Sequence, residues 1–276
     1  MSIPEMQACL ARLYVDDSFR KLFYIDAGNA LQEYKLTHDE LHAITEIDRQ
    51  MLEFFAASLK KKRRKQLQHV YPMLFKLRSE EIDRYYDRYY QLHISHRTNS
   101  VHQDALEFGT FMEESLDNAE RLPPYASDLA KFERMYYSVV SGLGTNELDD
   151  RSTVDSPSKA VNLETRPKTR RCVQIALVNY DIAEIHEMLE HGVDVDTQKC
   201  VQSEYAIVFQ AIPNSHIPRT LRLNGAAKTV LLLCDGRHTV SEILTTTQER
   251  LGVQGLEQGV IMTIERLVEE GVLDIR

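Results

Sequence analysis

The stretch from residue 219 to residue 275 carries the pattern that most restricts how this chain can fold. Leu221 and Leu223 alternate with polar neighbours, which predicts a half-buried strand. The apolar run that follows predicts a buried helix, and two amphipathic runs predict two further helices. A short apolar run ending at Ile275 predicts a closing strand. We therefore expect one small unit that contains a strand, three helices and a second strand.

Turn and cap residues mark the boundaries of these helices. Asn224 can cap the first helix, and Asp235-Gly236 ends it. Thr239 and Glu242 have the T-x-x-E spacing of a capping box, which opens the second helix. Because the caps agree with the apolar periods, the order of the elements follows from the sequence alone.

The segments LRLNGAAKTVLLLCDGRHTVSEIL and IERLVEEGVL resemble the PqqD-like peptide-recognition element of ribosomal natural-product pathways. The shared pattern is a strand ending in Leu-Asn, an apolar helix, Cys-Asp-Gly, Thr-Val-x-Glu-Ile, and a helix ending in Gly-Val-Leu. The resemblance implies a winged-helix-like domain. Such a domain binds the leader of a precursor peptide as an added strand.

The resemblance also implies which residues contact the leader. The expected contacts lie on the first strand and on the third helix of the unit: Arg219, Thr220, Leu221, Arg222, Leu223, Ile261, Glu265 and Val268. Alternating residues near 173–177 and 205–209 predict two more strands, which would complete a three-stranded antiparallel sheet. If the strand 219–223 lies at the edge of that sheet, its backbone groups are available to an incoming strand.

A winged-helix transcriptional regulator that binds DNA is the alternative interpretation. The third helix argues against it, because Arg266 is the single basic residue between Gly255 and Gly271, alongside four glutamates. Phosphates would repel such a helix. The formal net charge of −9 points in the same direction, so we expect no nucleic-acid partner.

Residues 1–141 are predicted to form an all-helical lobe, because their apolar residues recur at helical spacing. The segments LARLYVDDSFRKLF, ALQEYKLTHDEL, FFAASLKKKRR, YPMLFKL and LPPYASDLAKFER resemble, in this order, the partner subunits of multinuclear non-heme iron enzymes in natural-product pathways. That family includes the partners in methanobactin maturation and in 3-thiaglutamate biosynthesis, and the resemblance points to the second of these.

This second resemblance implies a heterodimer with an iron-dependent oxygenase, which would hold the iron. The complex would excise the β-methylene carbon of a cysteine at the end of a carrier peptide. The lobe 1–141 would dock that enzyme. Residues 142–170 carry few large apolar side chains and are expected to be a linker, followed by the PqqD-like domain in residues 171–276. The predicted fold class is α+β.

The basic run from Lys60 to Lys65 lies at the end of a long predicted helix. It fits a solvated helix end whose cations suit the helix dipole. It also fits a nuclear-localisation-like sequence, or a contact for an acidic peptide or partner. The sequence leaves these interpretations open.

The sequence contains no recognisable set of catalytic residues. It has no G-x-S-x-G, no H-E-x-x-H, no phosphate loop and no dinucleotide fingerprint. His93 and His96 could ligate a metal, with Asp104 or Glu107 as the nearest further ligands. We nevertheless expect a non-catalytic subunit with no metal or cofactor of its own, and keep a metal enzyme using these histidines as a third hypothesis.

Compartment and membrane association follow from what the sequence lacks. Four scattered cysteines form neither a C-x-x-C motif nor an evident disulfide framework. The start of the chain shows no signal peptide, and no apolar run approaches the length of a membrane span. We therefore expect a cytoplasmic protein without a membrane partner.

Overall fold

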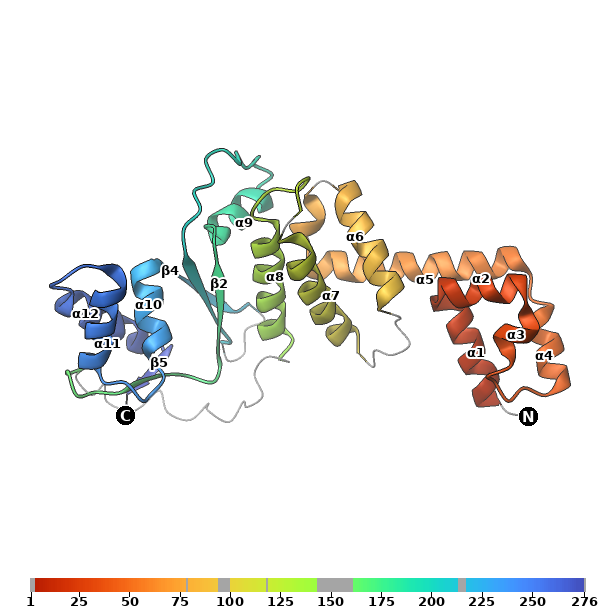
Figure 1. Cartoon of the computed structure of the whole chain (residues 1–276), viewed down its shortest axis with the longest axis horizontal. Helices are drawn as coiled ribbons and strands as arrows, with labels where there is room; N and C mark the ends of the chain where they lie inside the picture. The colour runs from red at the N-terminus through yellow and green to blue at the C-terminus, as the bar shows by residue number, and fades with distance from the viewer. Residues whose placement is uncertain are drawn as a thin grey trace. The chain divides into compact units, whose positions relative to one another are not determined.

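The computed structural model describes residues 3–77, 79–93, 100–117, 119–142, 161–212 and 217–275. The contacts within the chain divide it into two compact units, residues 1–122 and residues 123–276 (Figure 1). In the described part of the chain, no helix is both long enough and apolar enough to cross a membrane.

The first unit is helical throughout its described residues, which confirms the predicted helical lobe for this part of the chain. Its elements are α1 (Ile3–Val15), α2 (Asp17–Ile25), α3 (Ala27–Leu31), α4 (His38–Thr45), α5 (Arg49–Val70), the 3-10 turn η1 (Leu74–Lys76), α6 (Ser79–Leu92) and α7 (Val101–Leu116). Figure 1 shows α1 to α4 at the N-terminal half of α5, whereas α6 and α7 lie beside its C-terminal half.

A buried ion pair joins α5 to α7. The guanidinium of Arg63 donates from Nε to Oδ2 of Asp104 at 2.8 Å, and from Nη1 to the carbonyl of His93 at 2.8 Å. Arg63 and Asp104 are 6% and 7% exposed. Tyr89 also donates to Asp104, over 2.6 Å. One cation of the basic run is therefore part of the interior of this unit.

The second unit contains a three-stranded sheet, a two-stranded sheet and five helices in its described residues. Its elements are α8 (Ala126–Val140), β1 (Pro167–Thr169), β2 (Val173–Val178), α9 (Ile182–Glu190), β3 (Tyr205–Gln210), β4 (Arg219–Leu223), α10 (Gly225–Leu233), α11 (Val240–Leu251), α12 (Glu257–Glu269) and β5 (Leu273–Ile275). The strand order of the larger sheet is β2-β3-β4, with every pair antiparallel.

The larger sheet of the second unit is covered by helices on both faces. Val208 packs on one face into a core with Val230 of α10 and Ile264 of α12. On the other face, the ring of Phe209 packs against that of Phe132 of α8, with 5.3 Å between centroids. Figure 1 shows α10 to α12 on one side of β4, and α8 and α9 on the other. The four middle residues of the central strand β3 are buried because both faces of the strand are covered.

The division between the units differs from the expected boundary at residue 141. Helix α8 belongs to the second unit, where Oδ2 of Asp128 accepts the backbone N–H groups of Asn179 at 2.6 Å and Tyr180 at 3.1 Å. Apolar periodicity predicts a helix but not the element against which it packs, so the sequence placed α8 with the other helices.

The expected linker, residues 142–170, also differs from the structure at its C-terminal end. Pro167 to Thr169 form β1, which pairs antiparallel with β5. Upstream of it, the carbonyl of Thr165 accepts the N–H of Val240 at the start of α11. These residues are part of the second unit, whereas residues 143–160 lie outside the described residues.

The caps predicted for the C-terminal helices are confirmed. The side chain of Asn224 accepts the N–H of Ala227 at 3.0 Å, and Thr239 with Glu242 forms both bonds of the capping box. Asp235 accepts from the N–H of Arg237 and from that of His238, and these bonds hold the pKa of the Asp235 carboxyl at about 2.

Cys234, which precedes that turn, packs as an apolar residue. Its thiol is buried and lies 3.2 Å from the carbonyl of Val230. Burial raises the pKa of the Cys234 thiol to about 12, so the thiol stays protonated at neutral pH. The Cys-Asp-Gly sequence therefore ends a helix, and Gly236 supplies the positive φ of 81° that the turn requires.

Candidate functional site

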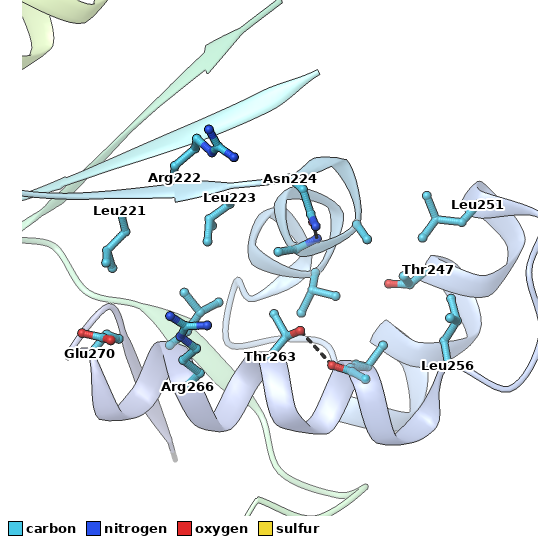
Figure 2. Close-up of a pocket in the computed structure, with 16 residues that line it drawn as sticks. Leu221, Arg222, Leu223, Asn224, Thr247, Leu251, Leu256, Thr263, Arg266 and Glu270 are labelled. Carbon is cyan, nitrogen blue, oxygen red and sulfur yellow. Dashed lines mark hydrogen bonds between the residues drawn. The ribbon is translucent and has the colours of Figure 1, made fainter. Parts of the chain in front are cut away.

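A groove of about 410 Å³ runs between β4 and α12 in the second unit (Figure 2). Four consecutive elements contribute its walls: β4, α10, the end of α11, and α12. The lining residues are Leu221, Arg222, Leu223, Asn224, Ala226, Ala227, Val230, Thr247, Leu251, Leu256, Gly259, Val260, Thr263, Arg266, Leu267 and Glu270.

The strand that forms one wall of the groove lies at a sheet edge. Its single strand neighbour among the described residues is β3, with Val208 opposite Leu221. Because alternate side chains of a strand point to opposite faces, Leu221 and Leu223 point together toward α12 (Figure 2). The backbone of β4 therefore presents a free edge directly beside an apolar groove.

The cation of Arg222 points away from the groove wall formed by its strand. It forms an ion pair with Asp181, which precedes α9, and its guanidinium lies 5.8 Å from the ring centroid of Tyr205. This contact anchors β4 to the opposite face of the sheet. It leaves the two leucines as the side chains that β4 directs into the groove.

The charge in the groove is concentrated at one end. Arg219 and Glu270 form an ion pair there. Arg266 points from α12 toward β4 (Figure 2), is exposed, and has no ion-pair partner among the residues that the structure describes. The groove thus combines apolar walls with one cation available to a ligand.

The other end of the groove contains an unpaired buried hydroxyl. Thr247 of α11 is 1% exposed, and its Oγ1 has no hydrogen-bond partner in the described part of the chain. In Figure 2 this hydroxyl points into the groove, whereas the hydroxyl of Thr263 donates to the carbonyl of Gly259 at 2.7 Å. Because an unpaired buried hydroxyl is costly, this side chain lowers the stability of the second unit.

Only some of the residues that the sequence predicted as peptide contacts line the groove. All five strand residues lie on the edge strand β4, and three of them, Leu221 to Leu223, line the groove. Ile261, Glu265 and Val268 do not line it, although they lie on the expected helix. Each of them is a sequence neighbour of a lining residue and lies on the adjacent face of α12.

Several lining residues were absent from the sequence prediction. Gly259, Thr263 and Arg266 follow Leu256 at the three- and four-residue spacing of one helix face, and this was the available signal. Thr247 and Leu251 come from α11, and only the packing of α11 beside α12 brings them to the groove.

Of the two histidines in the metal hypothesis, the structure describes His93 only. The ring of His93 stacks on Tyr89 at 4.5 Å. His96 lies outside the described residues. Within the described ranges, no three histidine, cysteine, aspartate or glutamate side chains come together as they would in a metal site.

The residues that form the groove lie in a segment that matches a known protein family. Residues 215–273 match the family described as Coenzyme PQQ synthesis protein D (PqqD). The match confirms the PqqD-type recognition element expected from the sequence. The matched residues make up less than half of the chain. No curated protein matches the chain. Residues 215–273 are therefore a PqqD-type domain, a class that suggests recognition of ribosomally synthesised precursor peptides.

Replacing Thr247 by valine is expected to raise the free energy of unfolding of the second unit by about 1 kcal/mol, because it removes the unpaired hydroxyl and keeps the branched shape. Urea unfolding and hydrogen exchange of α11 would measure the change. The matched control is Thr245→Val, since the exposed Thr245 hydroxyl already donates to the carbonyl of Ser241 at 3.0 Å. A loss of stability in Thr247→Val would show that the hydroxyl is bonded in solution.

Proposed function

We propose that this chain is a non-catalytic recognition subunit that binds the leader of a precursor peptide in the groove between β4 and α12. The observation that supports this proposal most directly is the free edge of β4 beside an apolar groove, inside residues that match the PqqD family. An extended peptide added to that edge would gain main-chain hydrogen bonds from β4.

The groove indicates what kind of peptide it would select. Alternate side chains of an added strand would enter the groove between Leu221, Leu223 and α12. Apolar side chains suit these walls, and a carboxylate at the charged end would pair with Arg266. The proposed ligand is therefore an extended leader segment with alternating apolar residues and an acidic residue.

The second part of the proposal concerns the partner. The order of helical segments in the first part of the chain resembles partner subunits of multinuclear non-heme iron enzymes, and we propose a heterodimer with such an enzyme. The helical lobe would dock the enzyme, and the iron would be bound by the enzyme. The reaction proposed for the complex is excision of the β-methylene carbon of a peptide cysteine, as in 3-thiaglutamate biosynthesis.

This arrangement explains why the partner enzyme would need a non-catalytic subunit. Holding the leader on the second unit converts delivery of the distant cysteine into an intramolecular step, and the local concentration of substrate at the partner rises accordingly. PqqD-type recognition domains are typically non-catalytic, which agrees with this division of roles.

The experiment that tests peptide recognition is a fluorescence anisotropy titration of the full chain. The probe, used as the leader, is a labelled synthetic peptide of alternating apolar residues with one acidic residue, the kind that the groove is proposed to select. The control is the same residues in scrambled order. We expect saturable binding of the leader alone. Equal binding of both peptides would contradict recognition in the groove.

Salt dependence distinguishes this proposal from the DNA-binding alternative. The exposed face of α12 carries Glu257, Glu265 and Glu269, which disfavours contact with phosphates. We expect the leader affinity to change less than about threefold between about 0.05 and 0.5 M salt, because strand addition and apolar contacts dominate. DNA binding would weaken by orders of magnitude over the same range. A tight, steeply salt-dependent complex with duplex DNA would support the regulator instead.

A further inference from the structure

A second surface, on the first unit, has the features of a protein interface. Helix α5 carries four large apolar side chains that are open to solvent: Met51 is 54% exposed, Phe54 66%, Phe55 44% and Leu59 41%. They occupy neighbouring turns of one side of α5, and the opposite side, with Leu52 and Ala56, is buried. Clustered apolar exposure of this kind marks an interaction site more often than scattered single residues do.

The apolar half of this surface is rigidly supported. The ring of Phe55 makes an edge contact with Tyr14 of α1, with 5.9 Å between centroids, and a second with Phe54 at 5.9 Å. Asp48 caps the helix by accepting the N–H of Met51 at 2.8 Å. The two aromatic rings are therefore presented on a capped helix, so docking onto them requires little ordering of the backbone.

The same side of α5 becomes basic in its next two turns. Of the basic run, Lys60 pairs with Asp87, Arg63 with Asp104 and Arg64 with Asp83. The remaining members, Lys61, Lys62 and Lys65, are exposed and have no ion-pair partner in the described part of the chain. Lys62 and Lys65 follow Phe55 and Ser58 at the spacing of one helix face. We call this continuous side of α5, from Met51 to Lys65, the α5 surface.

We propose that the α5 surface docks the partner enzyme, through an apolar contact on Phe54 and Phe55 and an acidic patch that faces Lys62 and Lys65. At about 1.5 Å per residue, the basic side chains lie about 10–17 Å along the helix from the aromatic rings. The partner should therefore present carboxylates at that distance from an apolar hollow. The identity of the partner rests on the proposed function, whereas the chemistry of the surface does not.

A second copy of this chain fits the α5 surface poorly. In an antiparallel pairing of two α5 helices, the lysines of one copy would lie on the phenylalanines of the other. In a parallel pairing the lysines would face each other and repel. A symmetric contact therefore leaves either the apolar half or the basic half without a complementary partner.

A membrane surface also fits poorly. A helix that lies in a membrane interface carries its apolar face along its whole length, with cations at the flanks. On α5 the apolar and basic halves follow each other along the axis, so a flat surface that accepted the phenylalanines would not extend under the lysines. The observations favour a protein with a matching order of apolar and acidic groups.

The test is binding of the purified full chain to a purified multinuclear non-heme iron enzyme of the class proposed as its partner, measured by interferometry. Phe54→Asp is expected to weaken the complex by about thirtyfold or more, as for a central aromatic contact. Lys62→Glu is expected to weaken it by about tenfold at low salt, mainly by slowing association, and by less at high salt. The matched control is Val101→Asp, at a side chain that is 54% exposed on α7 of the same unit.

The same samples would be titrated with the labelled leader, which both α5 variants should bind like the wild-type chain. Wild-type affinity for the enzyme in both variants would overturn the proposal. So would a dimer of the chain alone that Phe54→Asp dissociates, or retention of the chain on anionic phosphatidylglycerol vesicles that is lost in the variant. Failure of the wild-type chain to bind the enzyme would also overturn it, and intact leader binding would show that peptide recognition stands independently.

Discussion

Proline placed in β4 is expected to weaken leader binding at least about tenfold in one of two neighbouring variants, while that variant remains as stable as the wild-type chain. The variants are Thr220→Pro and Leu221→Pro. Neighbouring amides of a strand point to opposite sides, so one of the two donates to β3 and the other faces the free edge. Proline removes the N–H at its position. The variant that loses only the outward N–H should fold normally and bind the leader at least about tenfold more weakly.

Two measurements separate folding from binding in this pair. Hydrogen exchange of the β3 amides reports which variant has lost its bond to the sheet, and anisotropy reports leader affinity. Leu221→Val is the matched control, because it keeps the N–H and an apolar side chain that faces α12. The edge-strand proposal would be abandoned if a normally folded proline variant at each position bound the leader with unchanged affinity.

Replacing Asp104 by alanine is expected to lower the free energy of unfolding of the first unit by about 3–5 kcal/mol. The substitution leaves the buried cation of Arg63 without its counter-ion, and an unpaired buried charge is among the most destabilising changes known. It also leaves the Tyr89 hydroxyl without its acceptor side chain. Burial, together with the nearby carboxylate, holds the pKa of Tyr89 above its ordinary value, so this hydroxyl is a proton donor at neutral pH.

The matched control for Asp104 is Asp87→Ala. Asp87 pairs with Lys60 at 2.8 Å, and its side chain is 53% exposed, so its loss should cost no more than about 1 kcal/mol. Hydrogen exchange of α5, α6 and α7 during urea unfolding would report on the first unit alone. Equal stability of the two variants would mean that Arg63 reaches solvent when Asp104 is removed.

The two aspartates pair with members of the basic run that differ in burial, and the sequence does not show this difference. The run from Lys60 to Lys65 could be read as a solvated helix end or as a contact surface, and the residues themselves do not distinguish the members. In the structure, Arg63 is buried and paired, whereas Lys62 is exposed. The helical phase and the position of Asp104, forty-one residues away, make this distinction.

The C-terminal domain was the part of the fold most open to prediction. Its strands, caps and helix ends depend on contacts between residues close in sequence, such as Thr239 with Glu242, so local patterns suffice. The groove depends both on local patterns and on contacts between segments distant in sequence. Its strand wall follows from the alternation of Leu221 and Leu223, but its far end is set by α11 packing beside α12.

The sequence by itself determined the α+β class, the order of the C-terminal elements and the PqqD-type character of residues 215–273, because these are encoded in periodicity, caps and turns. The tertiary structure decided that α8 packs on the sheet of the second unit, that residues before β2 pair with β5, and that Thr247 faces the groove without a partner in the described part of the chain. It also decided which face of α5 stays open to solvent. Each of these depends on contacts between segments distant in sequence, and a local pattern carries no information about the element that will cover it.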